Sequence, residues 1–133
     1  MQNSELGSRQ KAAEKASNRR EVESSVTRFL VSIKQLLRVL SEWSHLKVDE
    51  NGVSDVYVQT INDFHTSVMA FAMLEINMSE LESVPEDLRH VLEECLSEEA
   101  SVPALMIYLP KVRQIITNVL EVLREKQQLF KGR

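Results

Sequence analysis

Large apolar residues recur along residues 21–44 at alternating spacings of four and three. This spacing is the seam of a coiled coil continued over three heptads. Leu30 and Leu37 widen the stripe, and a wide stripe suits a helix packed in a bundle. The pattern predicts a helix from Glu21 to Ser44, ~24 residues long and able to protrude from a small bundle by several turns. The seam consists of Val22, Val26, Phe29, Ile33, Leu36, Leu40 and Trp43.

A second apolar pattern predicts a helix from about Val53 to Leu74. It follows a predicted turn at residues 47–52, where an Asn-Gly pair marks a break, and Ser54 is the candidate N-cap. From Val68 onwards the segment is apolar all round, which predicts burial on several sides. Its inner face consists of Val53, Tyr57, Ile61, Phe64, Val68 and Phe71.

Residues 83–101 predict a third helix, with Ser83 or Val84 at its entry and Pro85 at its first position. Acidic residues then fill the first turn, where the helix dipole favours anions. Further along, Pro103 predicts a short helical segment, and Pro110 predicts the start or a kink of a long final helix that runs to about residue 130. The apolar face of the third helix consists of Leu88, Val91, Leu92, Cys95 and Leu96.

Composition supports a helical fold. Only three glycines, three prolines and 5% aromatic residues are present in 133 residues, which argues against an all-β protein. The length suits one domain with its own core. We therefore predict an all-α fold: a four- to five-helix, mostly antiparallel bundle with long first and last helices. Residues 1–20 are expected to be a flexible polar and basic tail, and residues 21–133 the helical bundle domain.

Charge is unevenly distributed along the chain. Residues 1–20 carry a net charge of +3, whereas residues 21–133 carry −7. Within the second part, residues 75–99 hold nine acids and one base, and residues 111–133 hold six bases and two acids. The two segments can attract each other, within one chain or between two copies. An acidic body repels nucleic acid, so no nucleic-acid partner is expected.

The sequence favours a cytoplasmic location. Its single cysteine cannot form an internal disulfide, which fits a reducing compartment. The amino terminus lacks the apolar core of a signal peptide. The longest apolar run, residues 68–74, is far shorter than the ~20 residues that span a bilayer.

No motif predicts catalysis, a cofactor or a metal site. His45, His65 and His90 fall in three different segments without ligand spacing. Cys95 lies on an apolar stripe, where a buried, inert thiol is expected. There is no glycine-rich phosphate loop, GxSxG or HExxH pattern. We therefore expect a protein that is not an enzyme. The acids Glu93, Glu94, Glu98 and Glu99 are interpreted as an exposed helix face.

Four stretches in order resemble the amino-terminal domain of the fungal actin-interacting protein three family, whose budding-yeast member is bud-site-selection protein six. Any one of them alone is a generic helix, but together they cover about 100 residues outside the first 20. They are VTRFLVSIKQLLRVLSEWS (26–44), VSDVYVQTINDF (53–64), VPEDLRHVLEECLSEEAS (84–101) and YLPKVRQIITNVLEVLREKQ (108–127).

The resemblance implies a role in cell polarity. Members of this family belong to the polarisome and cooperate with a formin in assembling actin cables. They are much longer than 133 residues, and their formin- and actin-binding part is carboxyl-terminal and absent here. The chain would then be a fragment that binds protein partners and directs the protein to the cell cortex, at the bud tip and bud neck, in association with the cytoskeleton.

The first hypothesis is a binding and targeting module of a polarity scaffold. The carboxylates of the third helix and the start of the second helix would form its partner surface. Aromatic residues can anchor partners, but Trp43 and Tyr57 continue apolar stripes and are expected in the core; Tyr108 remains open. The partner-binding candidates are Val53, Asp55, Tyr57, Glu86, Asp87, Glu93 and Glu94.

Two alternatives stay open at this point. The chain could be a structural homo-oligomerisation domain, with the first part of the heptad seam joining two copies as a homodimer. Alternatively, basic residues of the tail and of the last helix (Lys126, Lys131 and Arg133) could contact lipid or actin, or simply complement the helix dipole. The acidic body allows peripheral membrane contact at most. The candidate dimer seam is Val22, Val26, Phe29 and Ile33.

Overall fold

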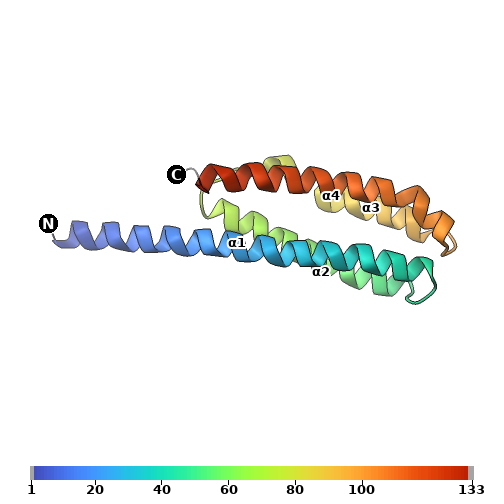
Figure 1. Cartoon of the computed structure of the whole chain (residues 1–133). Coiled ribbons are helices and arrows are strands. Elements are labelled where there is room, and N and C mark those ends of the chain that lie inside the picture. The colour runs from blue at the N-terminus through green and yellow to red at the C-terminus, as the bar shows by residue number, and fades with distance from the viewer. Residues whose placement is uncertain (1, 132–133) are drawn as a thin grey trace.

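A computed structural model describes residues 2–131 and shows, in this range, four α-helices and no strand (Figure 1). The helices are α1 (Gln2–Ser44), α2 (Glu50–Ala72), α3 (Val84–Leu96) and α4 (Val102–Lys131), and a short 3-10 helix, η1 (Ser79–Leu81), lies between α2 and α3. The predicted all-α fold with long first and last helices is confirmed.

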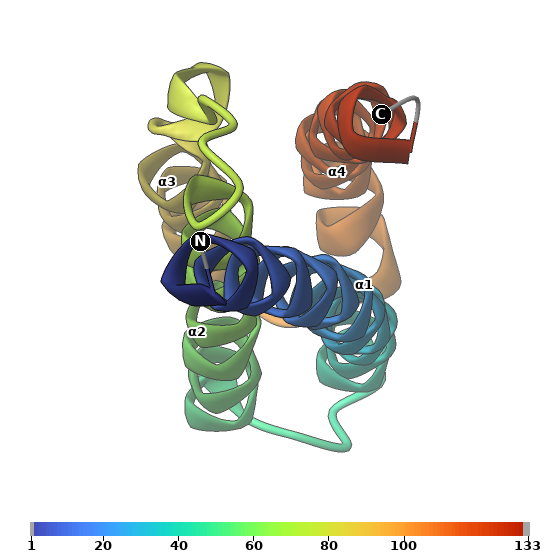
Figure 2. The same cartoon turned by 90° about the vertical axis from the view of Figure 1, so that its left-hand side faces the viewer.

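The four helices run alternately up and down and form a bundle. Viewed along its axis in Figure 2, α1 and α2 form one side, and α3 and α4 form the other. The α1–α2 and α3–α4 loops lie at the same end of the bundle (Figure 1). At the opposite end, the first part of α1 extends beyond the other helices. Short connections between consecutive helices favour this antiparallel order.

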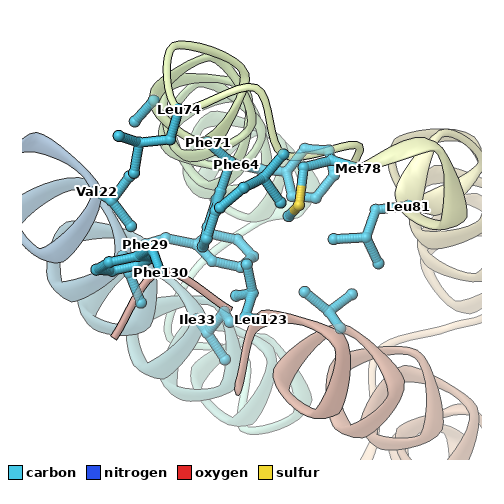
Figure 3. Packing of buried hydrophobic residues seen from close by; sticks show 14 residues of the cluster. Val22, Phe29, Ile33, Phe64, Phe71, Leu74, Met78, Leu81, Leu123 and Phe130 are labelled. Atoms are coloured by element: carbon cyan, nitrogen blue, oxygen red, sulfur yellow. The ribbon is translucent and has the colours of Figure 1, made fainter. Parts of the chain in front are cut away.

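One half of the core lies at the end of the bundle from which α1 extends. Figure 3 shows Val22, Phe29 and Ile33 of α1 facing side chains of α2 and α4. The Phe29 and Phe64 rings lie 5.6 Å apart between centroids, in a tilted arrangement that aromatic pairs favour. The buried members of this cluster are Val22, Val26, Phe29, Ile33, Phe64, Ala70, Phe71, Leu74, Ile76, Met78, Leu81, Val119, Leu123 and Phe130.

The other half of the core lies toward the loop end. There α1 contributes the second part of its heptad stripe, and α3 contributes most of its apolar face. Trp43 is buried, as expected from its place in the stripe. The buried members are Leu36, Val39, Leu40, Trp43, Val53, Leu88, Leu92, Cys95, Ala104, Leu105 and Val112.

Small polar residues hold α1 and α2 close together. The Ser32 hydroxyl donates a hydrogen bond to the Asp63 carboxylate of α2. The Thr60 hydroxyl donates to the Val56 carbonyl one turn back at 2.7 Å, and lies 3.4 Å from the Ser32 carbonyl. These hydroxyls are paired, so burying them carries little desolvation cost.

The chain is helical from Gln2, so the helix start predicted at Glu21 is wrong. The side chains of residues 9–17 are exposed, so this segment lies outside the core. Its polar composition explains why the sequence suggested a tail: it has no apolar stripe to bury, and it is helical as a continuation of α1. The division into a flexible tail and a domain stays a prediction.

The start of α2 also differs from the prediction. The helix begins at Glu50 within the predicted turn, and Asp49 caps it by accepting a hydrogen bond from the Gly52 N–H at 3.0 Å. Ser54 therefore lies inside the helix and is not its cap. Asp is among the strongest N-capping residues, and its carboxylate also complements the helix dipole.

The carboxyl end of α2 is not buried on all sides, contrary to the prediction. Phe71 is fully buried, but Met69 and Met73 are each 65% exposed. The reason is that α1 and the α2–α3 connection cover only part of the helix surface. An apolar run of seven residues thus leaves two methionines in contact with solvent.

A single helix, α4, replaces the short segment and long helix predicted from the two prolines. Pro110 lies inside it. Ala104 and Leu105 before the proline, and Val112 and Val119 after it, are all buried. This continuous core face offsets the ~3 kcal/mol that an internal proline costs a helix.

Both α1 and α2 end in a Schellman motif without glycine. Leu46 has φ 62° and Glu75 has φ 60°. After α1, the Lys47 N–H donates to the Glu42 carbonyl at 2.9 Å and the Leu46 N–H to the Trp43 carbonyl at 3.0 Å. These bonds satisfy the last carbonyls of the helix, but the left-handed conformation is strained for a residue with a Cβ.

We expect Asp49→Ala to lower the free energy of unfolding by about 1 kcal/mol, because the Gly52 N–H loses its capping partner. Urea denaturation followed by circular dichroism measures this change. Ser54→Ala is the matched control and should change the free energy of unfolding by less than about 0.5 kcal/mol. A larger loss for Ser54→Ala than for Asp49→Ala would contradict the observed helix start.

Replacing Leu46 by glycine should stabilise the protein by roughly 0.5–1 kcal/mol. Glycine adopts positive φ without steric cost, and Leu46 is 78% exposed, so little packing is lost. Lys47→Gly, at the neighbouring exposed position without positive φ, should not stabilise. Thermal unfolding of both variants is the measurement, and equal effects would argue against the strained Schellman motif.

Candidate partner-binding surface

The four predicted acids of α3 lie on its outer surface. The Arg89 guanidinium is 2.6 Å from the Glu86 carboxylate and 3.7 Å from that of Glu93. His90 Nε2 lies 2.9 Å from the Glu94 carboxylate. These pairs are solvent-exposed and contribute little to stability. They leave the face acidic, because four carboxylates, those of Glu86, Asp87, Glu93 and Glu94, share it with a single arginine.

Asp87 differs from the other acids because its partner is neutral. Its carboxylate accepts a hydrogen bond from the Ser83 hydroxyl at 3.0 Å, at the start of α3. The same carboxylate lies in the first turn, where the helix dipole stabilises its charge. Asp87 is therefore a fixed negative charge that remains available to a cation.

One groove runs between α2 and α3. It has a volume of about 170 Å³. Tyr57 lines it and donates its hydroxyl hydrogen to the Pro85 carbonyl at 2.7 Å, a bond that joins α2 to the first turn of α3. Burial raises the pKa of the Tyr57 phenol, so it keeps this proton at neutral pH. The lining residues are Val53, Ser54, Tyr57, Val58, Arg89, Leu92, Glu93 and Leu96.

One predicted member of the partner surface needs correction here. Val53 is 0% exposed and belongs to the core, because α1 covers its face of α2. Asp55 is exposed and lies outside the groove, and its role in partner binding stays a prediction. Tyr57 is half-buried and lines the groove, so its expected core role is only partly right.

A larger groove, about 660 Å³ in volume, runs between α3 and α4. Its α3 wall is acidic, whereas Lys111 stands on the α4 wall. The Lys111 ammonium also lies 5.6 Å from the centroid of the Tyr108 ring, within cation–π range. The lining residues are Glu86, Asp87, His90, Val91, Pro110, Lys111, Gln114 and Ile115.

Sequence reasoning missed the α4 wall of this groove. Pro110 was interpreted only as a helix signal, and Gln114 was not singled out. The periodicity of α4 shows which residues face inward, but not which of its sides borders α3. The signal that the sequence did contain is Ile107, a large apolar residue one turn before Lys111 on the same side of α4, and the structure shows that its side chain is exposed.

The shape and charge of this groove suit a peptide segment. Its apolar floor, formed by Val91, Pro110 and Ile115, lies between a mostly acidic and a mostly neutral rim. No sheet edge is present in residues 2–131 to add a strand, which leaves the modes that use an apolar groove, helix-in-groove binding among them.

The predicted dimer seam is inside the bundle. Val22, Val26, Phe29 and Ile33 are all buried within a single chain. The prediction of a surface seam is therefore corrected, because α2 and α4 cover the stripe that a second copy would need. The pattern was right about helix packing and did not reveal which helices supply the partners.

The basic residues at the end of α4 are only partly described. Lys126 forms an ion pair with Glu80 at 3.0 Å, and its hydrogen bond lowers the pKa of that carboxyl. The predicted attraction between the acidic middle and the basic end thus occurs within one chain at this pair. The side chain of Lys131 and all of Arg133 lie outside the described residues.

The side chains that could act as nucleophiles or metal ligands are buried or far apart. Cys95 is buried as predicted, and burial raises the pKa of its thiol to about 11. Among residues whose side chains are described, no three His, Cys, Asp or Glu side chains gather in a way that could hold a metal ion. Within the same part of the chain, no helix is long and apolar enough to cross a membrane.

Comparison with protein families gave one match. The family model described as Aip3p/Bud6 N-terminal domain matches residues 23–131, which is most of the chain. Searches of curated proteins and of solved structures found no match. The matched range covers all four helices except the first part of α1, and it includes both grooves beside α3.

At pH 8 we expect Cys95 in the folded protein to react with a disulfide reagent at least about 100-fold more slowly than in the unfolded chain. A pKa of about 11 in place of 9.0 lowers the thiolate fraction by this factor. The absorbance of the thiolate that the reagent releases, followed with and without urea, gives the ratio of the two reaction rates. Similar rates in both states would show that the thiol is accessible.

Proposed function

The chain belongs to the Aip3p/Bud6 N-terminal domain family, and from this premise we propose that it is a non-enzymatic protein-interaction and cortical-targeting domain of a cell-polarity scaffold. The scaffold works with a formin in actin-cable assembly. Its direct partners would be polarisome proteins and the formin pathway, and actin would be bound by a carboxyl-terminal part that this chain does not contain.

The observation that carries this proposal is the α3–α4 groove. It combines an apolar floor with polar rims, an acidic one on α3 and a mostly neutral one on α4, which are the usual parts of a peptide-binding site. Asp87 on one rim and Lys111 on the other can fix the orientation of a bound helix. The buried, protonated thiol of Cys95 and the separated histidines support a binding role rather than a catalytic one.

The proposed location is the cytoplasmic side of the cell cortex, at the bud tip and bud neck. Membrane contact would be peripheral, through basic residues, and nucleic acid would be repelled by the acidic body. Oligomerisation through the heptad seam is a weaker second candidate, because the four residues that motivated it are covered within one chain.

Targeting can be tested with the whole chain fused to a fluorescent protein in budding yeast that lacks the endogenous relative. We expect foci at the bud tip and bud neck. Gln114→Arg should disperse them, because the long cationic side chain fills the groove and pairs with Asp87. Thr117→Arg is the matched control: it is exposed on the same helix, does not line the groove, and should keep the foci.

A diffuse signal for the unaltered chain would contradict the targeting function. Foci that survive Gln114→Arg would retain targeting but exclude the α3–α4 groove. In that case Glu93→Lys/Glu94→Lys tests the remaining acidic face of α3. Circular dichroism of each variant must show an intact bundle, since only then does a loss of foci report on binding.

A further inference from the structure

A third groove lies on the other side of the bundle, between α1 and α2. It has a volume of about 350 Å³. Its rim carries two of the most exposed apolar side chains, Met69 and Met73, one helical turn apart. Methionine is adaptable and common at binding surfaces. The lining residues are Glu21, His65, Thr66, Met69, Ala70 and Met73.

The first part of α1 ends next to this groove, and no other described helix packs along it. The first part of α1 extends beyond the bundle (Figure 1); its residues 9–20, of which 9–17 are exposed, are here called the α1 overhang. Its side chains are exposed up to Ser17, and among the side chains that the structure describes, none of the five bases between Arg9 and Arg20 forms an ion pair. A polar helix of this length gains little stability without tertiary contacts.

The charges of the overhang and of the groove end are opposite. Residues 9–20 contain five bases and one acid. Glu21 lines the groove, and the exposed Glu75 and Glu82 follow α2 at the same end of the molecule. An overhang laid along this end would meet carboxylates as well as the methionine surface. Such complementary charge favours one orientation of approach.

A symmetric dimer can give both the overhang and the α1–α2 groove a partner. The overhang and the carboxyl end of α2 lie at the same end of the bundle (Figure 1), and residues from this end of α2 line the groove. A two-fold axis at this end places the overhang of each copy beside the groove of the other, in a closed interface. The overhang cannot fold back into its own groove, because α1 is a continuous helix through residue 44.

We propose that two copies of this chain associate end to end, with the α1 overhang of each copy lying in the α1–α2 groove of the other. This interface is distinct from the heptad seam, which stays in the core of each copy. It is also distinct from the α3–α4 groove, so partner binding and self-association use different helices. The proposal does not depend on the proposed targeting function.

Sedimentation velocity of the full chain tests this proposal. We expect a dimer at about 100 µM protein, within the range of weak specific interfaces. Met73→Lys should weaken association at least tenfold, because it places a positive charge in the groove opposite the basic overhang. Val58→Lys is the matched control on the same helix: Val58 is also exposed but lies outside this groove, and association should be unchanged.

A monomer at this concentration would overturn the proposal, as would a dimer that Met73→Lys leaves intact. Charge reversal gives a second arm. Lys11→Glu/Lys15→Glu in the overhang should also weaken association, and added salt should weaken the unaltered dimer. Salt-independent association that tolerates this reversal would exclude the overhang as the occupant.

Cross-linking between two differently tagged copies locates the contact. One copy carries Cys at Ala12, Ala13 or Ala16, and the other carries Met69→Cys. We expect mixed disulfide dimers from at least one of these pairs and none when Val58→Cys replaces Met69→Cys. The native Cys95 is buried and contributes no background. Mixed dimers formed equally well with Val58→Cys would contradict the interface.

Discussion

The fold depends on burial of one stripe, the alternating four-three seam of α1, within a single chain. Every turn of this stripe from Val22 to Trp43 is covered, first by α2 and α4 and then also by α3. Burying an apolar side chain of this size contributes roughly 1.5–3 kcal/mol. Because α1 supplies both halves of the core, α2, α3 and α4 are positioned by their contacts with it. The grooves lie where two neighbouring helices do not pack fully against each other.

The sequence predicts what is local and periodic. The apolar spacing identified the helices, the burial of Trp43 and Cys95, and the antiparallel order. The spacing did not predict helix boundaries that depend on a specific cap or a tertiary contact. Asp49 rather than Ser54 caps α2, and α4 continues through Pro110 because its core face is unbroken. It also could not tell whether the seam of α1 faces another helix of the same chain or a second copy, since both satisfy the same heptad pattern.

The candidate site, too, could be predicted from the sequence only in part. The acids of α3 were recognised from composition, but the groove they border needs a wall from α4 that lies about 20 residues away in sequence. Val53 followed the periodicity of an inner face, and the structure places it in the core rather than on the partner surface. The grooves on which the proposed function rests are spaces between helices, and such spaces can be located only once the paired faces of the helices are known.

Hydrogen exchange of a dilute sample tests most directly whether the α1 seam is closed within one chain. At about 1 µM protein, where weak self-association is negligible, the amides of residues 26–43 should exchange only through global unfolding and remain as protected as in a concentrated sample. Rapid exchange of these amides in the dilute sample, slowing as concentration rises, would show instead that a second copy covers the seam.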